Sequence, residues 1–256
     1  MKYLLCSLVL LLSVGYSPFH LKYKPLNLVE LKKYEQSIHS QNGEDGVIEK
    51  ICECIGAPSQ FFVDLGAGDG YFMSNTWHLR EKGWKGLLLD AENENHSINL
   101  HKEWITAVNV NTLLQKYHVP HEFDLLSIDL HSNDFYIWQA MSDHYKPRMI
   151  VINYNANFSP DEDKVVIYDP NRKWDYTNYY GASALALFHL AREKGYSLVF
   201  ADSWGVSLFF IRDDIIENTF WRFRNRNDLS KLHVQMTWHR QDPYSRSYVG
   251  SLELLK

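Results

Sequence analysis

The stretch Phe61-Phe62-Val63-Asp64-Leu65-Gly66-Ala67-Gly68-Asp69-Gly70 decides the fold. Its first half is a short apolar run typical of a buried strand, and its second half is rich in glycine. Glycine has no Cβ, so the backbone of this half can turn sharply and approach a ligand closely. Ligands of open α/β sheets bind at the carboxyl edge of the strands, and this turn therefore predicts a binding site.

The segments that follow alternate between apolar runs and amphipathic stretches, which predicts an α/β fold. Together with 61–65, strands are expected over 86–90, 105–110, 123–130, 149–154, 196–201 and 206–212, and helices over 43–55, 74–82, 93–102, 133–142 and 182–194. We predict a Rossmann-like, seven-stranded, mostly parallel sheet with helices on both faces. The short turn at 203–205 makes the final strand antiparallel.

The chain divides by composition into four parts. Residues 1–17 form a signal- or anchor-like segment, 18–40 a polar lead-in, 41–212 the α/β domain and 213–256 a C-terminal extension. The apolar run within residues 3–14 is as long as the core of a signal peptide and short for a membrane span. We expect membrane association through it. Lysines after the run favour the cytoplasmic face, and a secretory route is the alternative; cleavage stays open.

Composition excludes several classes of protein. The 256 residues are 45% hydrophobic and 22% charged, as in ordinary globular domains. The net charge of −5 argues against nucleic acid as a partner, because that ligand needs a basic surface. Three cysteines cannot build a disulfide scaffold or a four-cysteine zinc site. The sequence says nothing about the oligomeric state.

The end of the second strand adds a carboxylate to the glycine turn. Asp90 stands where an acid can accept hydrogen bonds from the ribose hydroxyls of a nucleoside. A dinucleotide fingerprint would place its third glycine at Tyr71 or Met73, so nicotinamide and flavin dinucleotides are disfavoured. The turn with Gly66, Gly68 and Gly70 therefore predicts a nucleoside site without a cradled pyrophosphate.

These motifs resemble those of class I S-adenosylmethionine-dependent methyltransferases over about residues 40–212. The stretches Ser40-Gln41-Asn42-Gly43-Glu44-Asp45-Gly46, Tyr168-Asp169-Pro170 and Tyr179-Tyr180-Gly181-Ala182-Ser183 also look like those of FkbM-type relatives. The resemblance implies S-adenosylmethionine as cofactor and methyl transfer as activity. It further implies that Asp64, Gly66 and Gly68 line the methionine part of the donor and that Asp90 holds the ribose.

The chain departs from the family pattern at two turns. After the fourth strand, His131 and Ser132 stand where the resemblance leads us to expect an acid and a glycine. At the end of the fifth strand, Asn153 stands in place of a glutamate. If those acids bind a metal or act as a base, this chain has lost part of that capacity.

Asp129 and His131 are the candidate catalytic residues, because they follow the fourth strand at the predicted site. Transfer of a methyl group to oxygen needs a positioned nucleophile and a base. Asp129 is the first candidate for the base and His131 the second, since an ordinary histidine pKa is near ~6.5. Asp134 is more simply a first-turn helix acid. No second ligand cluster supports a metal here, so no metal site is predicted.

Asn153, Trp174 and Tyr180 are the candidate acceptor-binding residues. Asn153 ends a strand, and aromatic faces in the 156–178 loop and just after it suit sugars or planar acceptors. Loop packing explains the aromatic residues equally well.

Three functions follow from the sequence. The first is O-methylation of a small-molecule or glycan-type acceptor. The second is a binding module for S-adenosylmethionine with weakened catalysis, suggested by His131 and Asn153. The third is a membrane-associated interaction protein that keeps only the methyltransferase-like fold.

Overall fold

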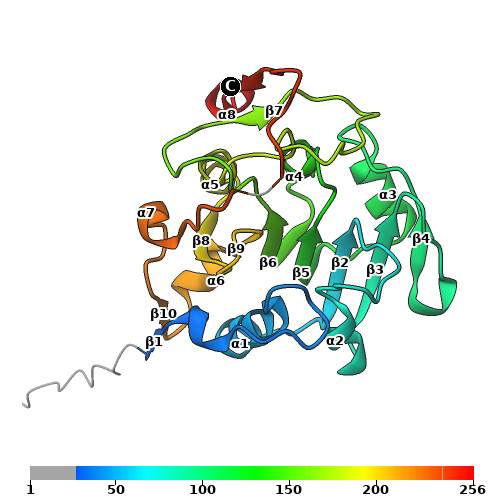
Figure 1. Ribbon diagram of the computed structural model, residues 1–256. Coiled ribbons are helices and arrows are strands. Elements are labelled where there is room, and N and C mark those ends of the chain that lie inside the picture. The colour runs from blue at the N-terminus through cyan, green and yellow to red at the C-terminus, as the bar shows by residue number, and fades with distance from the viewer. Residues whose placement is uncertain (1–26, 238) are drawn as a thin grey trace, which may run out of the picture.

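The computed structural model describes residues 27–237 and 239–256, and its centre is a seven-stranded sheet (Figure 1). The strand order is β4-β3-β2-β5-β6-β9-β8. The strands are β2 (Phe61–Leu65), β3 (Lys85–Asp90), β4 (Leu100–Lys102), β5 (Glu122–Ile128), β6 (Lys146–Asn153), β8 (Tyr196–Ala201) and β9 (Ser207–Arg212). Only β9 in this sheet runs antiparallel to its neighbours, β6 and β8. The predicted fold class is therefore confirmed.

The strand order reverses between β2 and β5. From β2 the chain proceeds to β3 and β4 on one side, and it then returns to place β5 and β6 on the other side. The connections that leave β2 and β5 consequently run in opposite directions along the sheet, and open α/β sheets bind their ligands at such a point. The glycine turn and Asp129 lie at this point of strand reversal, because each directly follows one of the two strands.

Helices cover both faces of the sheet. In Figure 1, α1 (Glu44–Ile55), α2 (Trp77–Glu81) and α6 (Asp213–Glu217) lie on one side, and α3 (Val110–Lys116), α4 (Asp134–Ala140) and α5 (Ala184–Glu193) on the other. Successive strand residues point to opposite faces. Phe62 accordingly joins the core under α1 and α2, and Val63 joins the core under α3, α4 and α5.

Two sequence predictions between β3 and β5 are wrong. The helix expected over 93–102 is a single turn, η2 (His96–Ile98), followed by β4. Asn99 ends the turn in a left-handed conformation with φ 58°, and Leu100–Lys102 then pairs with β3. The strand expected over 105–110 is a loop that leads into α3, with its apolar ends Ile105 and Val110 buried.

The remaining short elements tie the ends of the chain to the domain. They are β1 (Asn27–Val29), η1 (Leu31–Tyr34), β7 (Val165–Val166), β10 (Trp221–Phe223), α7 (Leu229–Leu232), β11 (Tyr248–Val249) and α8 (Ser251–Leu254). β1 pairs in parallel with β10, and β7 pairs antiparallel with β11. The segment after residue 212 thus returns to the domain and reaches the 156–178 loop through β11. The four-part division of the chain stays a prediction.

The predicted signal- or anchor-like segment, including residues 3–14, lies outside the described residues, as does the first part of the lead-in. Among residues 27–237 and 239–256, no helix has the length and apolar character that crossing a bilayer requires.

Candidate functional site

The glycine turn after β2 combines one forced close contact with one open position. Gly66, Gly68 and Gly70 all have positive φ, at 88°, 56° and 77°. A Cβ on Gly66 would lie 2.0 Å from the carbonyl oxygen of Asp129, so only glycine lets the loops after β2 and β5 meet. A Cβ on Gly68 would meet nothing within 4 Å. The backbone at Gly68 is therefore open to a ligand.

Gly70, the last glycine of the turn, packs closely against neighbouring side chains. A Cβ there would lie 2.7 Å from Cδ1 of Ile98. The guanidinium of Arg80 donates a hydrogen bond to the Gly70 carbonyl. Gly70 is thus a packing position, and Gly68 is the open one.

Asp90 lies at the end of β3, as predicted, but its carboxylate already has several partners. Oδ2 accepts the backbone N–H of Gly68 at 3.1 Å. Oδ1 accepts the backbone N–H groups of Glu92 and Asn93 at 2.8 Å and the Asn93 side-chain amide at 2.9 Å. A carboxylate offers about four acceptor positions. Oδ2 keeps room for one further donor, fewer than the two ribose hydroxyls expected from the sequence.

Asp64 is buried within β2. Its Oδ2 accepts a hydrogen bond from Oγ1 of Thr76 at 2.8 Å. Burial raises the pKa of Asp64 to about 6. The side chain therefore ties β2 to the segment that leads into α2.

Asp129 and His131 form an ion pair at the end of β5. Nδ1 of His131 lies 2.9 Å from Oδ1 of Asp129, and His131 adopts a left-handed φ of 58°. The hydrogen bond and the negative charge of Asp129 raise the pKa of His131 to about 9. The imidazole is therefore charged at neutral pH, whereas the sequence prediction assumed an ordinary pKa and a usable base.

Asp134 supports this turn from inside. Its carboxylate accepts the backbone N–H groups of Leu130 at 2.8 Å and Ser132 at 3.0 Å. The side chain is buried at the first position of α4. Asp134 thus holds the backbone on both sides of His131, and His131 projects from the turn.

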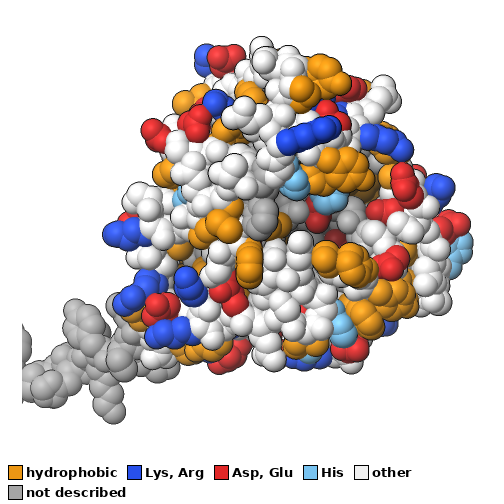
Figure 2. All heavy atoms as spheres, viewed as in Figure 1, with side chains coloured by type: hydrophobic (Ala, Val, Ile, Leu, Met, Phe, Trp, Pro, Cys, Tyr) orange, Lys and Arg blue, Asp and Glu red, His pale blue; other side chains and the backbone are white. Residues whose placement is uncertain are grey.

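A cavity of about 360 Å³ opens beside the ion pair. Five residues predicted from the sequence line it: Asp129, His131, Asn153, Trp174 and Tyr180. The sequence prediction missed six others: Gln41, Asn42, Tyr154, Gly205, Val206 and His239. Figure 2 views the molecule from this side, and its central hollow has acidic and histidine side chains inside and hydrophobic ones around the rim. The volume is within the range of small-molecule sites, about 300–1,000 Å³.

Trp174 connects the walls of the cavity. Its ring centroid lies 5.5 Å from that of His131, 5.8 Å from that of Tyr180 and 4.5 Å from that of His239. Its indole N–H donates to the carbonyl of Thr177 at 2.8 Å. This wall therefore combines the turn after β5, the 156–178 loop and the C-terminal segment.

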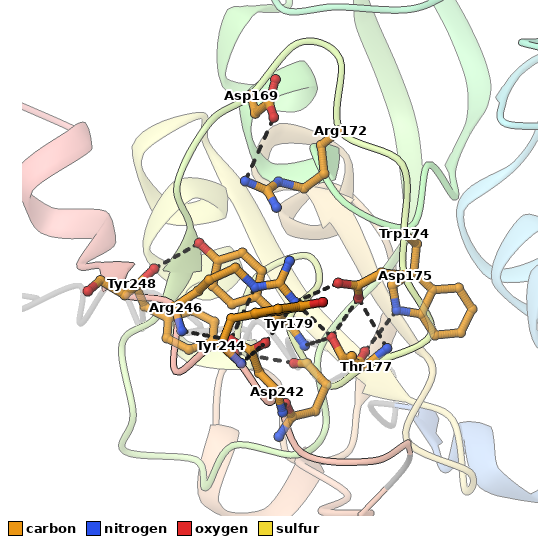
Figure 3. A network of polar contacts seen from close by, with 12 residues as sticks. Asp169, Arg172, Trp174, Asp175, Thr177, Tyr179, Asp242, Tyr244, Arg246 and Tyr248 are labelled. Atoms are coloured by element: carbon orange, nitrogen blue, oxygen red, sulfur yellow. Dashed lines mark hydrogen bonds and ion pairs between the residues drawn. The ribbon is translucent and has the colours of Figure 1, made fainter.

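Figure 3 shows what holds this wall in place: Arg246 lies between Asp175 and Asp242 and over the ring of Tyr179. The guanidinium donates to Asp175 at 2.7 Å and to both oxygens of Asp242, at 2.9 and 3.1 Å. The charge of Arg246 and its hydrogen bonds lower the pKa of Asp242 to about 2. The C-terminal segment is thus fastened to the residue next to Trp174.

The missed residues Gln41 and Asn42 come from the segment before α1. Oδ2 of Asp45 accepts three consecutive backbone N–H groups, those of residues 38–40, at 2.7–2.9 Å. Glu44 accepts the backbone N–H of Asn42 at 2.7 Å. The acids of the Gln41–Gly46 motif therefore shape the segment that supplies two cavity residues. That motif was a usable signal, whereas nothing in the sequence pointed to His239.

A second, smaller hollow of about 80 Å³ lies on the other side of Leu130, where β3, β4 and β5 end. It is lined by Ala91, Glu103, Trp104, Ile105, Leu130, Asn133 and Arg172. Within the described part of the chain, Oδ1 of Asn133 and Nε of Arg172 are buried without a hydrogen-bond partner. Unsatisfied buried polar atoms are costly, so this acceptor and this donor are free for a polar ligand.

Comparison with known proteins finds a weak likeness of fold. No family model matches the chain, and neither does any curated protein. Among solved structures, the chain is similar to an S-adenosylmethionine-dependent methyltransferase from Clostridium acetobutylicum, with 13% identity and a TM-score of 0.39 over 72% of this chain and 92% of that one. It is also similar to an O-methyltransferase family protein from Burkholderia thailandensis, with 11% identity and a TM-score of 0.38 over 66% of this chain and 57% of that one.

Likenesses at this level carry no conclusion about chemistry. The fold class rests on the strand order of this chain itself. The finer resemblance to FkbM-type relatives stays a prediction, since no family model supports it.

Proposed function

We propose that this protein transfers a methyl group from S-adenosylmethionine to a hydroxyl oxygen of a small-molecule or glycan-type acceptor. One observation carries the proposal: the open backbone of Gly68 lies beside Asp90 at the point of strand reversal, and the turn after β5 at the same edge separates two hollows of different character. A donor with a nucleoside at one end and a reactive group at the other needs such an arrangement.

The smaller hollow suits the purine edge of the donor. Its free acceptor on Asn133 and free donor on Arg172 complement an exocyclic amine and a ring nitrogen. The indole of Trp104 lines the same hollow and offers a flat apolar surface to the ring. Asp90 would then accept one ribose hydroxyl through the remaining position on Oδ2. The amino-acid end would lie over the bare backbone of Gly68.

The larger cavity suits the acceptor. Trp174, Tyr154 and Tyr180 offer aromatic surfaces, and the amides of Gln41, Asn42 and Asn153 both donate and accept hydrogen bonds. This combination fits a ring that carries several hydroxyl groups.

Asp129 is the proposed base. S-adenosylmethionine supplies a methyl group on a positively charged sulfonium, and its departure leaves a neutral thioether. The acceptor oxygen forms the new bond to carbon, and its proton passes to the Asp129 carboxylate. His131 is already protonated at neutral pH, so it contributes a positive charge beside Asp129 and no free base.

A second function has a specific observation behind it. The carboxylate of Asp129 is already paired with a charged imidazole at 2.9 Å, so the group that must take the proton is held in an ion pair. A domain that binds S-adenosylmethionine without turnover fits this pairing.

Calorimetric titration with S-adenosylmethionine and S-adenosylhomocysteine tests donor binding. Gly68→Ala should weaken binding at least tenfold while the protein stays folded, because its new methyl group occupies only open space. Gly195→Ala is the matched control, since Gly195 has φ 76°, nothing within 4 Å of its Cβ, and a place after α5 away from the site. Failure of the folded wild-type protein to bind either ligand would overturn the proposal.

A radiolabelled-methyl screen with sugars and small alcohols separates the enzyme from the binding module. For an enzyme, Asp129→Asn should reduce turnover far more than donor affinity. Donor binding without product from any acceptor, in wild type and variant alike, favours the binding module.

A further inference from the structure

The face of the molecule that carries α2 holds a second cluster of reactive side chains. His39 precedes the segment of Gln41 and Asn42, while His78 and Glu81 lie on α2. Their ligand-type atoms lie within 4.8 Å of one another, and the described residues contain no other such group of three. From this geometry we propose that His39, His78 and Glu81 bind a divalent transition-metal ion, with Zn²⁺ as the best fit. The proposal is independent of the methyl-transfer function.

The distances suit one small ion. Nε2 of His39 lies 2.9 Å from Oε2 of Glu81, and Nδ1 of His78 lies 3.7 Å from the same oxygen. Tetrahedral zinc with bonds of about 2.0–2.1 Å holds its ligand atoms roughly 3.4 Å apart. The two observed separations lie on either side of that value, so small side-chain movements complete the site.

His78 supplies the independent observation. Its side chain is only 13% exposed, and both ring nitrogens are buried without a hydrogen bond to any described residue. Its two carboxylate contacts, at 3.6 Å to Glu49 and 3.7 Å to Glu81, are too long for hydrogen bonds that would offset the desolvation of the ring. A metal ion at Nδ1 would remove that cost on one side of the ring.

The other side of the ring faces a carboxylate. Oε2 of Glu49 lies 3.6 Å from Nε2 of His78. Metal-binding histidines almost always donate their second ring N–H to such a group, which fixes the tautomer and raises the basicity of the ligand. Lys82 pairs with Glu49 and not with Glu81, so its positive charge is neutralised outside the ligand set.

The ring of His39 is also fixed in orientation. It stacks on Trp77 with a centroid distance of 3.8 Å and an interplanar angle of 13°. Two histidines and one carboxylate are a donor set that zinc accepts with a water molecule in the fourth position. The ion would join α2 to the segment that supplies Gln41 and Asn42 to the large cavity.

The test uses the full, untagged chain after treatment with a chelator. Zn²⁺ is titrated by calorimetry, and Co²⁺ is titrated by the visible absorption of a tetrahedral cobalt site. We expect one ion per chain and a rise in Tm with Zn²⁺. His39→Gln and Glu81→Gln should each weaken binding at least tenfold, and Glu81→Gln should leave the fold intact because the Glu81 side chain is half-exposed. Glu49→Gln should weaken binding by about tenfold through the second ring nitrogen.

Glu94→Gln is the matched control, because Glu94 pairs with His96 at 3.0 Å on the surface, outside the three-residue cluster. It should leave binding unchanged. The proposal fails if the folded wild-type protein binds neither ion, or if His39→Gln and Glu81→Gln bind as tightly as wild type.

Discussion

Arg246 and Asp175 form an ion pair at 2.7 Å that joins the C-terminal segment to the loop carrying Trp174. Asp175 also accepts the hydroxyl of Thr177 at 2.6 Å, and Thr177 in turn accepts the indole N–H of Trp174 through its carbonyl. The position of one cavity wall therefore depends on a side chain that does not line the cavity.

Arg246→Ala should lower both stability and acceptor affinity. Loss of the guanidinium leaves Asp175 and Asp242 without their cation, and we expect the free energy of unfolding to fall by about 1–3 kcal/mol. KM for the acceptor should rise while the Kd for S-adenosylmethionine stays the same. Denaturant unfolding and steady-state kinetics measure the two effects. The exposed Arg240 in the same segment provides the control, Arg240→Ala. An equal loss of donor affinity would show that Arg246 acts on the whole edge of the sheet.

The charge of His131 should depend on Asp129. NMR titration of the imidazole should give a pKa of about 9, and Asp129→Asn should lower that pKa toward the ordinary histidine value. Because the native pKa lies above the unfolded one, the ion pair stabilises the fold below about pH 6.5. This stabilisation should disappear as the pH rises through about 9. A native pKa near 6.5 in the wild-type protein would disprove the pairing.

Gly66→Ala should damage the fold itself. The new Cβ would lie 2.0 Å from the Asp129 carbonyl oxygen, and φ is 88°. The steric clash and the backbone strain therefore both destabilise the variant. We expect a loss of about 2–5 kcal/mol in the free energy of unfolding. Gly195→Ala meets no neighbouring atom and has only the cost of a side chain at positive φ. Its free energy of unfolding should therefore fall by about 1–2 kcal/mol. Equal losses in the two variants would mean that the loops after β2 and β5 move apart freely.

Asp64→Asn should remove a pH dependence of stability. The native pKa of about 6 lies above the unfolded value, so wild-type stability falls as pH rises from about 4 to 7. Over that interval, the free energy of unfolding of the variant should rise by on the order of 3 kcal/mol relative to that of the wild type, since one pKa unit is about 1.36 kcal/mol. Its amide oxygen still accepts the Thr76 hydroxyl. Unfolding measured at pH 4 and pH 7 tests this, and parallel changes in both proteins would contradict it.

The sequence predicted the fold where local pattern and burial agree. Phe61–Leu65 and Tyr196–Ala201 are apolar runs bounded by turns, and both are strands. The prediction failed between Asn93 and Val110, where the strand Leu100–Lys102 is only three residues long and depends on pairing with β3. A strand of that length has too little periodicity to recognise, and Ile105 and Val110 are buried at the entrance to a helix.

The residues of the candidate site also fall into those that the sequence could predict and those that it could not. Residues at the end of a strand, such as Asn153, or directly after one, such as Asp129, were predictable because parallel strands end at one edge. His239 was not predictable, because a long return of the chain brings it to Trp174. The partners of Asp90 were also not predictable, since a hydrogen bond from a backbone N–H does not depend on the type of residue that donates it.

The large cavity has consequences for how the protein is made. The glycine turn, Asp90 and the Asp129–His131 pair have all been synthesised by about the midpoint of the chain, whereas His239 and the Arg246 tether emerge near the end of translation. A nascent chain can therefore form this edge of the sheet well before the C-terminal part of the cavity wall exists. Premature termination after β9 would leave the cavity without His239 and its Trp174 wall without the Arg246 tether.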